Sequence, residues 1–290
     1  GMTLNDNVYG TFEEDVFRRD FTMNAIYYEP LGKETIDLAG GNADIESQVI
    51  RTIGDPTGRL REDPVRMLRA IRFEAKLEFS LEANLQSSIK LLGHLLQDIP
   101  PARLFEEVLK LFLSGHATAA FDSMMKNEIY GWLFPDSKGS MANNATEELV
   151  RLALTSTDHR IAKQMPVTPA FIYAAMLWYP FVVEKERLEH QGAITYTAAH
   201  EAANNVISKQ QLFTSIPKRF SGPVRDIWFL QSRLPSRFGQ KPDRTMSHKR
   251  FRAAYDFLLL REQAGEETGQ LGEWWTEYQE ATEERKLAMK

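Results

Sequence analysis

Cysteine is absent from the 290 residues of this chain, and histidine occurs six times. The sequence therefore excludes disulfides, zinc-thiolate sites and cysteine nucleophiles, and it is typical of a protein from a reducing compartment, so we expect a cytoplasmic location. The histidines are scattered, without the H-x-x-x-H or H-E-x-x-H spacing of a metal site. No G-x-S-x-G elbow and no P-loop is present either.

Long hydrophobic runs are also lacking. The longest, residues 170–183 (AFIYAAMLWYPFVV), is shorter than the roughly 20 residues of a membrane span and contains Pro180. It predicts a buried helix, and we expect no interaction with a membrane. With 43% hydrophobic and 26% charged residues, the chain is long enough to form two or three packed units.

The net charge of −5 argues against a protein that coats nucleic acid by bulk charge. The distribution of charge indicates something different, because residues 209–252 hold eleven Lys or Arg and two Asp. This basic segment could follow a phosphate backbone. Its alternative reading is a solvated face, or a face that packs against the acidic residues 262–284. The candidate RNA-binding residues within it are Lys218, Arg219, Arg225, Lys249, Arg250 and Arg252.

The order of the structural signals predicts a mainly α protein that begins with a remnant of an α/β fold. A capping box, Thr11 with Glu14, predicts a helix over residues 12–19, and β-prone runs follow at 25–28, 35–38 and 49–53. Asp63-Pro64 predicts the start of a helix, with Asp as N-cap and Pro in the first position. Helices are then expected near residues 83–97, 101–114, 117–130, 145–155, 169–182, 195–210, 221–234, 248–262 and 271–287, with loops at 136–145 and 235–247.

Two clusters carry candidate chemistry, and the first is residues 18–24 (RRDFTMN), where a helix should end and a strand begin. Two guanidiniums beside a carboxylate and an amide suit a triphosphate and a ribose, because Arg binds phosphate oxygens bidentately and Asn can hydrogen-bond sugar hydroxyls. The alternative is structural, since cations at a helix C-terminus are favoured by the helix dipole alone.

The second cluster is residues 61–73 (REDPVRMLRAIRF). Asp63 and Arg66 are three residues apart, so a helix would place an acceptor beside a donor fork. Adenine and cytosine each present an amino donor next to a ring-nitrogen acceptor, so such a pair could select A or C without a template, and Glu62 would orient the Arg. The alternative is that Asp63 is an N-cap and Arg66 its surface partner.

Taken together, the two clusters and the intervening GG.AD and VIR.IG resemble the class II nucleotidyltransferases, which comprise the CCA-adding tRNA enzymes and the bacterial poly(A) polymerases. Further along, residues 98–107 (DIPPARLFEE), 169–180, 216–219, 225–228 and 251–256 are similar to the bacterial poly(A) polymerases. The resemblance covers residues 4–280. It implies template-independent addition of AMP from ATP to RNA 3′ ends with Mg²⁺, and three parts: a nucleotidyltransferase head remnant over 1–55, a helical neck over 56–135 and a helical RNA-binding body over 136–290.

The resemblance also implies roles for individual residues. Asp20 matches an active-site carboxylate; Arg18, Arg19 and Asn24 would line the triphosphate and ribose; Glu62, Asp63 and Arg66 would read the base, with Arg69 as a further candidate. The family also carries a Gly-Gly phosphate loop and a D-x-D pair that hold two metal ions, and nothing in residues 1–17 matches them. We therefore expect no metal ligands in this chain and no catalysis by it alone. Two alternatives stay open, a CCA-adding tRNA nucleotidyltransferase and a non-catalytic helical module that binds RNA or protein.

Overall fold

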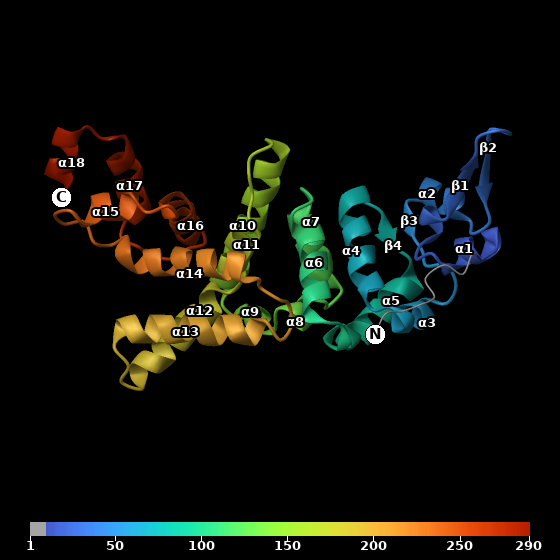
Figure 1. The fold of residues 1–290 in the computed structure, drawn as a ribbon, viewed down its shortest axis with the longest axis horizontal. Helices are drawn as coiled ribbons and strands as arrows, with labels where there is room; N and C mark the ends of the chain where they lie inside the picture. The colour runs from blue at the N-terminus through green and yellow to red at the C-terminus, as the bar shows by residue number, and fades with distance from the viewer. Residues whose placement is uncertain (1–9) are drawn as a thin grey trace. The chain divides into compact units, whose positions relative to one another are not determined.

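A computed structural model describes residues 10–290, which divide into two compact units (Figure 1). The first unit contains the described residues up to Ile99 together with Asp122–Ile129, and the second contains Pro100–Phe121 and Tyr130–Lys290. Helices dominate both units, so the expected mainly α class is confirmed. The division into head remnant, neck and body stays a prediction.

The first unit holds all four described strands and several short helices. In chain order these are α1 (Phe12–Arg18), η1 (Thr22–Asn24), β1 (Ile26–Glu29), β2 (Glu34–Asp37), α2 (Gly41–Glu46), β3 (Val49–Ile50), α3 (Pro56–Glu62), α4 (Val65–Leu77), β4 (Ser80–Leu81), α5 (Ala83–Leu92) and η2 (Gly93–Asp98).

The predicted start of this unit is confirmed. Thr11 and Glu14 form the expected capping box at the N-terminus of α1. Strands β1 and β2 pair antiparallel, with Ile26 opposite Asp37. A second, parallel pair joins β3 to β4, which the sequence did not predict because β4 has two residues and no alternating pattern.

Backbone hydrogen bonds hold residues 20–22 against residues 51–53. The Thr22 N–H donates to the Arg51 carbonyl at 3.0 Å, and the Ile53 N–H donates to the Asp20 carbonyl at 3.1 Å. The predicted β-prone run 49–53 therefore contributes an isolated antiparallel bridge, Phe21 with Thr52, beyond β3. This pairing fixes the backbone of the first candidate cluster.

The helix expected at Asp63-Pro64 begins one residue later, at Val65, and a further helix precedes it. Asp55 caps α3 by accepting from the Gly58 N–H, with Pro56 in the first turn. The sequence contained this signal, but the Gly54-Asp55-Pro56 run reads equally well as a turn. Asp63 is thus the extended residue at which α3 ends and α4 follows.

The second unit is built of helices within the described residues. They are α6 (Pro101–Phe112), the first half of α7 (Ala117–Lys126), α8 (Tyr130–Leu133), α9 (Pro135–Ser140), α10 (Asn144–Ala162), α11 (Pro169–Met176), α12 (Trp178–His190), α13 (Thr195–Gln210), α14 (Lys218–Arg233), α15 (Lys241–Met246), α16 (Phe251–Gln263), α17 (Leu271–Glu280) and α18 (Glu283–Met289).

Two expected loops of this unit are wrong, because they contain α9 and α15. Both helices begin with proline near the first position, Pro135 and Pro242, and both are six residues long. Their short, polar sequences carry no hydrophobic periodicity, which is why they read as loops. Neither they nor any other helix in residues 10–290 is long and apolar enough to cross a membrane.

Aromatic side chains fill the core of the second unit. Trp228 of α14 is buried, stacks on Phe181 at 4.6 Å between ring centroids, and donates from Nε1 to the Ala174 carbonyl at 3.0 Å. Near the C-terminus, Trp275 is buried and donates to the Leu234 carbonyl at 3.0 Å. The apolar run 170–183 forms α11 and the start of α12 and is largely buried, as expected.

Candidate nucleotide-binding site

Asp20 connects the two candidate clusters. Its Oδ1 accepts from the Phe21 N–H at 2.9 Å and from Asn24 Nδ2 at 3.0 Å. Its Oδ2 accepts from Arg69 Nε at 2.6 Å, across 49 residues of chain. Arg69, which the sequence placed at the margin of the site, is therefore the ion-pair partner of the candidate active-site carboxylate.

These contacts decide the charge state of Asp20. Burial of the carboxylate opposes ionisation, but the hydrogen bond from Asn24 and the charge and hydrogen bonds of Arg69 outweigh it, so the pKa of Asp20 lies below its usual value. Asp20 is an anion at neutral pH, and its charge is already matched by Arg69.

The two arginines of the first cluster lie against α1. Arg18 Nε donates to Asp15 Oδ1 at 2.6 Å, and Arg19 Nη2 donates to Asp15 Oδ2 at 3.1 Å. Arg19 also donates to the Asn24 carbonyl at 3.0 Å and lies over the Tyr27 ring. Both guanidiniums thus pair with Asp15, as the structural alternative requires. Exposed ion pairs contribute only about 0–1 kcal/mol, so a triphosphate could displace Asp15 at low cost.

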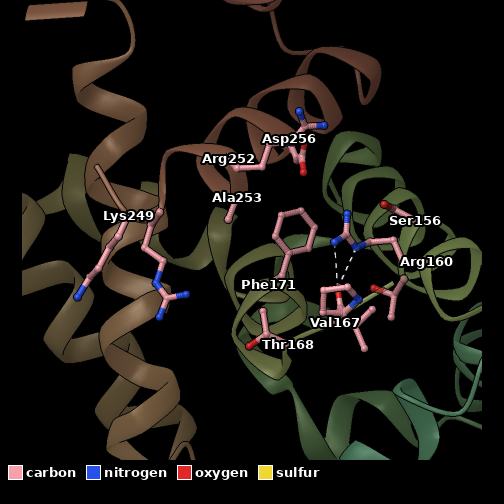
Figure 2. A pocket seen from close by; sticks show the side chains of 12 residues that line it. Ser156, Arg160, Val167, Thr168, Phe171, Lys249, Arg252, Ala253 and Asp256 are labelled. Atoms are coloured by element: carbon pink, nitrogen blue, oxygen red, sulfur yellow. Dashed lines mark hydrogen bonds and ion pairs between the residues drawn. The ribbon is translucent and has the colours of Figure 1, made fainter. Parts of the chain in front are cut away.

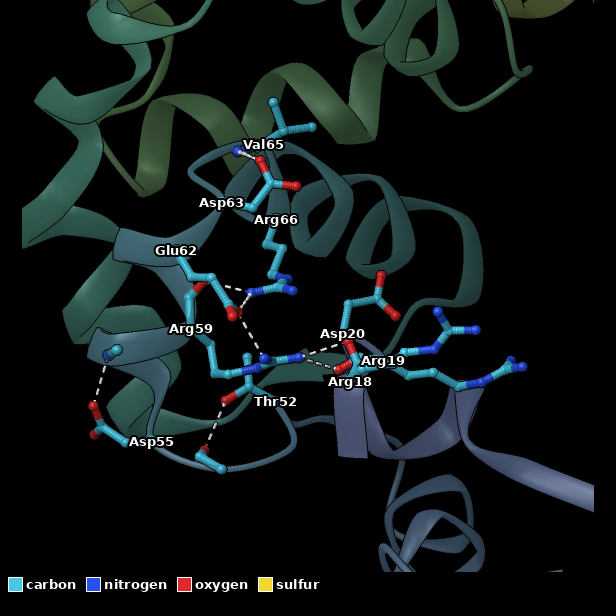
Figure 3. Close-up of polar contacts among 12 residues, drawn as sticks. Arg18, Arg19, Asp20, Thr52, Asp55, Arg59, Glu62, Asp63, Val65 and Arg66 are labelled. Carbon is cyan, nitrogen blue, oxygen red and sulfur yellow. Dashed lines mark hydrogen bonds and ion pairs between the residues drawn. The ribbon is translucent and has the colours of Figure 1, made fainter. Parts of the chain in front are cut away.

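Arg59 links the clusters a second time and was missed by the sequence analysis (Figure 3). Its Nη2 donates to the Arg18 carbonyl at 2.9 Å and also to the Arg19 carbonyl. Its Nη1 donates to Glu62 Oε2 at 2.6 Å. The side chain is mostly buried, and its Nε has no hydrogen-bond partner in the described part of the chain. The sequence offered one signal for Arg59, because it lies four residues before Asp63. A predicted helix over α3 would have placed Arg59 about one helical turn before the second cluster.

Glu62 holds Arg66, as expected. Arg66 Nη1 contacts Glu62 Oε2 and donates to the Arg59 carbonyl at 2.7 Å. The hydrogen bond from Arg66 and the charge of Arg59 lower the pKa of Glu62. One carboxylate thus orients two guanidiniums, one from each end of the α3–α4 corner.

Asp63 does not lie beside the Arg66 guanidinium as the sequence predicted. Figure 3 shows its carboxylate turned toward the Val65 N–H, which donates to Oδ1 at 3.3 Å, while the Arg66 guanidinium turns toward Glu62. The physical reason is the extended backbone at Asp63, which ends α3 and directs the side chain over the start of α4. The base-reading role of Asp63 stays a prediction.

Among residues 10–290 no group of three or more His, Asp or Glu side chains converges. Asp20 accepts from three protein donors and has an arginine as its charge partner. Residues 1–9 lie outside the described residues.

The candidate RNA-binding residues separate into groups within the second unit. Lys249, Arg250 and Arg252 line one pocket, while Arg225 of α14 donates to Asn204 at 3.0 Å. Lys218 and Arg219 lie in the first turn of α14. Part of the basic segment follows the structural alternative, since Arg237 donates to the Gly269 carbonyl at 3.1 Å and lies over Trp274.

Family models match three stretches of the chain. The poly(A) polymerase head domain matches residues 3–51, the probable RNA- and SrmB-binding site of polymerase A matches 78–140, and the polymerase A arginine-rich C-terminus matches 191–290. Poly(A) polymerase I of Haemophilus influenzae is 43% identical over 284 residues, which are 96% of this chain and 63% of the relative. This chain belongs to the poly(A) polymerase family. The resemblance stated from the sequence is confirmed, and the chain spans about three fifths of the length of this relative.

The CCA-adding branch is more distant. A CCA-adding enzyme of Streptococcus pneumoniae is 36% identical over 168 residues, 58% of this chain and 39% of the relative. The solved structure of the Thermotoga maritima CCA-adding enzyme complexed with tRNA has a TM-score of 0.60 at 19% identity, covering 93% of this chain and 60% of that one. The likeness to this solved structure shows a shared fold.

Proposed function

We propose that this chain is the nucleotide-selecting and RNA-holding part of an enzyme that adds AMP from ATP to RNA 3′ ends without a template. In that reaction the RNA 3′ oxygen bonds to the α-phosphorus of ATP and pyrophosphate leaves. The observation that carries the proposal is the 43% identity to a poly(A) polymerase I over 96% of the chain.

The site geometry supports a division of roles. Asp63 and Arg66 read the base, and Glu62, which also contacts Arg59, orients Arg66. Arg18, Arg19 and Asn24 face the triphosphate and ribose. Asp20 keeps Asn24 and Arg69 in place. ATP and Mg²⁺ are the expected substrate and cofactor of the whole enzyme.

The test is adenylate addition to an RNA oligonucleotide with each of the four NTPs separately. The chain is assayed alone and as a chimera that carries, at its amino end, the segment of the Haemophilus influenzae relative that the chain does not match. The expected result is long tails from the chimera with ATP, and no extension by the chain alone.

Three other results would contradict the proposal. Extension by the chain alone would show that its metal ligands lie within it. Addition of C, C and A to a tRNA end would place it with the CCA-adding enzymes, which share 36% identity over part of this chain. A folded chimera that binds RNA but no nucleotide would favour a non-catalytic binding module.

A further inference from the structure

A pocket of about 230 Å³ lies in the second unit, at the end of α10, the loop before α11 and the start of α16 (Figure 2). Segments 156–171 and 249–256 form its walls. Its volume equals the liquid volume of roughly eight water molecules, which is of the order of one nucleoside. Lys249, Arg250 and Arg252, three of the residues expected to bind RNA, line it.

The middle of the pocket is aromatic. Figure 2 shows the Phe171 ring between Arg160 and Ala253, with Val167 and Thr168 beside it. Phe257 contacts this ring edge-on, at 6.0 Å between centroids and 88° between planes, and so fixes its orientation. Phe171 is partly exposed, whereas the neighbouring α11 residues are buried. A fixed and partly exposed ring is a surface on which a nucleobase can stack.

The rim of the pocket carries two cations that have no partner among the described residues 10–290. Arg252 pairs with Asp256 at 3.0 Å, and Arg160 donates to the Pro166 carbonyl at 3.0 and 3.1 Å. By contrast, Lys249 and the guanidinium of Arg250 make no hydrogen bond or ion pair with residues 10–290, and Arg250 Nε is buried without an acceptor. Buried donors without acceptors are rare, so an anionic ligand would satisfy a deficit that the protein leaves open.

We propose that this pocket binds one nucleotide of single-stranded RNA, with the base against Phe171 and the adjacent phosphate facing Lys249 and Arg250. The proposal rests on the proposed function in so far as RNA is the substrate, and it adds the place in the body where the strand is held. An aromatic ring combined with uncommitted cations is the pairing that single-stranded nucleic acid requires, since stacking holds the base and charge holds the backbone.

The experiment measures binding of a fluorescently labelled oligoadenylate to the whole chain by anisotropy over a range of salt concentrations. Phe171→Leu should weaken binding about 5- to 150-fold, because a stacked base is lost. Phe171→Tyr, which keeps the ring, should bind like the unaltered chain. Lys249→Gln should lower the slope of log K against log salt by about 0.7, the value for one phosphate contact to a single strand.

Lys33→Gln is the matched control, because it removes the same charge from an exposed side chain in the turn between β1 and β2, outside the pocket and outside the stretch 78–140 that matches a probable RNA-binding site. Thermal unfolding of each variant reports whether it is folded. If Phe171→Leu does not fold, Phe171→Tyr and Lys249→Gln still test the pocket. A duplex RNA of the same length should bind more weakly, because its bases are not available to stack.

Two results would overturn the proposal. If Phe171→Leu and Lys249→Gln bind the oligonucleotide like Lys33→Gln, RNA is held elsewhere, and the proposed polymerase function is untouched. If the unaltered chain shows no saturable binding even at low salt, the pocket has no such ligand. Conversely, RNA binding that depends on the pocket, together with a chimera that transfers no adenylate, would support the RNA-binding pocket and contradict the proposed function.

Discussion

Asp20 and Arg69 form an ion pair that joins the end of α1 to the middle of α4, with Arg69 Nε 2.6 Å from Asp20 Oδ2. The carboxylate is mostly buried and the guanidinium about one third exposed. The family resemblance assigns Asp20 to the active site. The geometry adds a structural role, because the same carboxylate holds Asn24 and the backbone of Phe21.

A double-mutant cycle measures this pair. Asp20→Asn, Arg69→Gln and the double variant should give a coupling energy of about 0.5–3 kcal/mol in urea unfolding at pH 7. Each single variant should cost more than an exposed pair would, because one buried partner is left behind. Additive effects of the two changes would show that the contact contributes nothing.

The same pair predicts a dependence on pH. Because the folded pKa of Asp20 is lowered, its contribution is complete above the unfolded pKa of about 3.9 and is lost as the pH falls through the lower folded pKa. The difference in unfolding free energy between the unaltered chain and Asp20→Asn should therefore shrink below about pH 4. A difference that grows on acidification would contradict the assigned direction.

Arg59 provides a prediction about selectivity. Arg59→Gln removes the donor to Glu62 and to the carbonyls of Arg18 and Arg19, so Glu62 is held from one side only. In the chimera, the preference for ATP over the other NTPs should fall, because the orientation of Arg66 is less restricted. The measured quantity is the ratio of kcat/KM values.

Arg61→Gln is the control for this change, since Arg61 is exposed on the same helix. A purely structural role for Arg59 would lower kcat/KM for all four nucleotides equally and leave their ratio unchanged. That outcome would contradict the assignment of Arg59 as a positioning residue.

The elements of this fold were predictable where a local signal acts alone. The capping box at Thr11 and Glu14 fixes the start of α1 without help from the rest of the chain. The site residues 18–24 and 61–73 were found for a different reason, because their amino-acid sequences resemble motifs of a known family. Local physics alone favours the structural alternatives, a dipole-stabilised arginine pair and an N-cap with its surface partner.

The contacts between the clusters were beyond sequence reasoning. Arg69 meets Asp20 across 49 residues, and Arg59 meets Arg18 across 41, and no periodicity encodes such pairs. The position of the Asp63 carboxylate depends on a helix break that the sequence did not reveal. The pocket around Phe171 joins segments about 80 residues apart, so its unpaired cations emerge only from the fold.

Gly41 gives a prediction about the packing of α2 against residues 20–22. A Cβ at this position would lie 2.4 Å from the Thr22 carbonyl oxygen, a backbone atom that the pairing with Arg51 holds in place. Gly41→Ala should therefore destabilise the chain by about 1–3 kcal/mol through forced displacement. Gly139→Ala is the control, because nothing lies within 4 Å of its added Cβ and the site is helical, so it should be neutral or stabilising. Equal effects of the two changes would show that the segments 20–22 and 40–41 are not tightly packed.

Trp228 gives the last prediction, for the core of the second unit. Trp228→Phe removes the indole N–H that donates to the Ala174 carbonyl and leaves a void beside Phe181. Loss of a buried hydrogen bond and of ring volume should together cost about 1–3 kcal/mol of unfolding free energy. Tyr196→Phe, at a side chain that is 72% exposed, should change it by less than about 0.5 kcal/mol. If the two substitutions cost the same, the stacked Trp228–Phe181 pair does not organise the packing of α12 against α14.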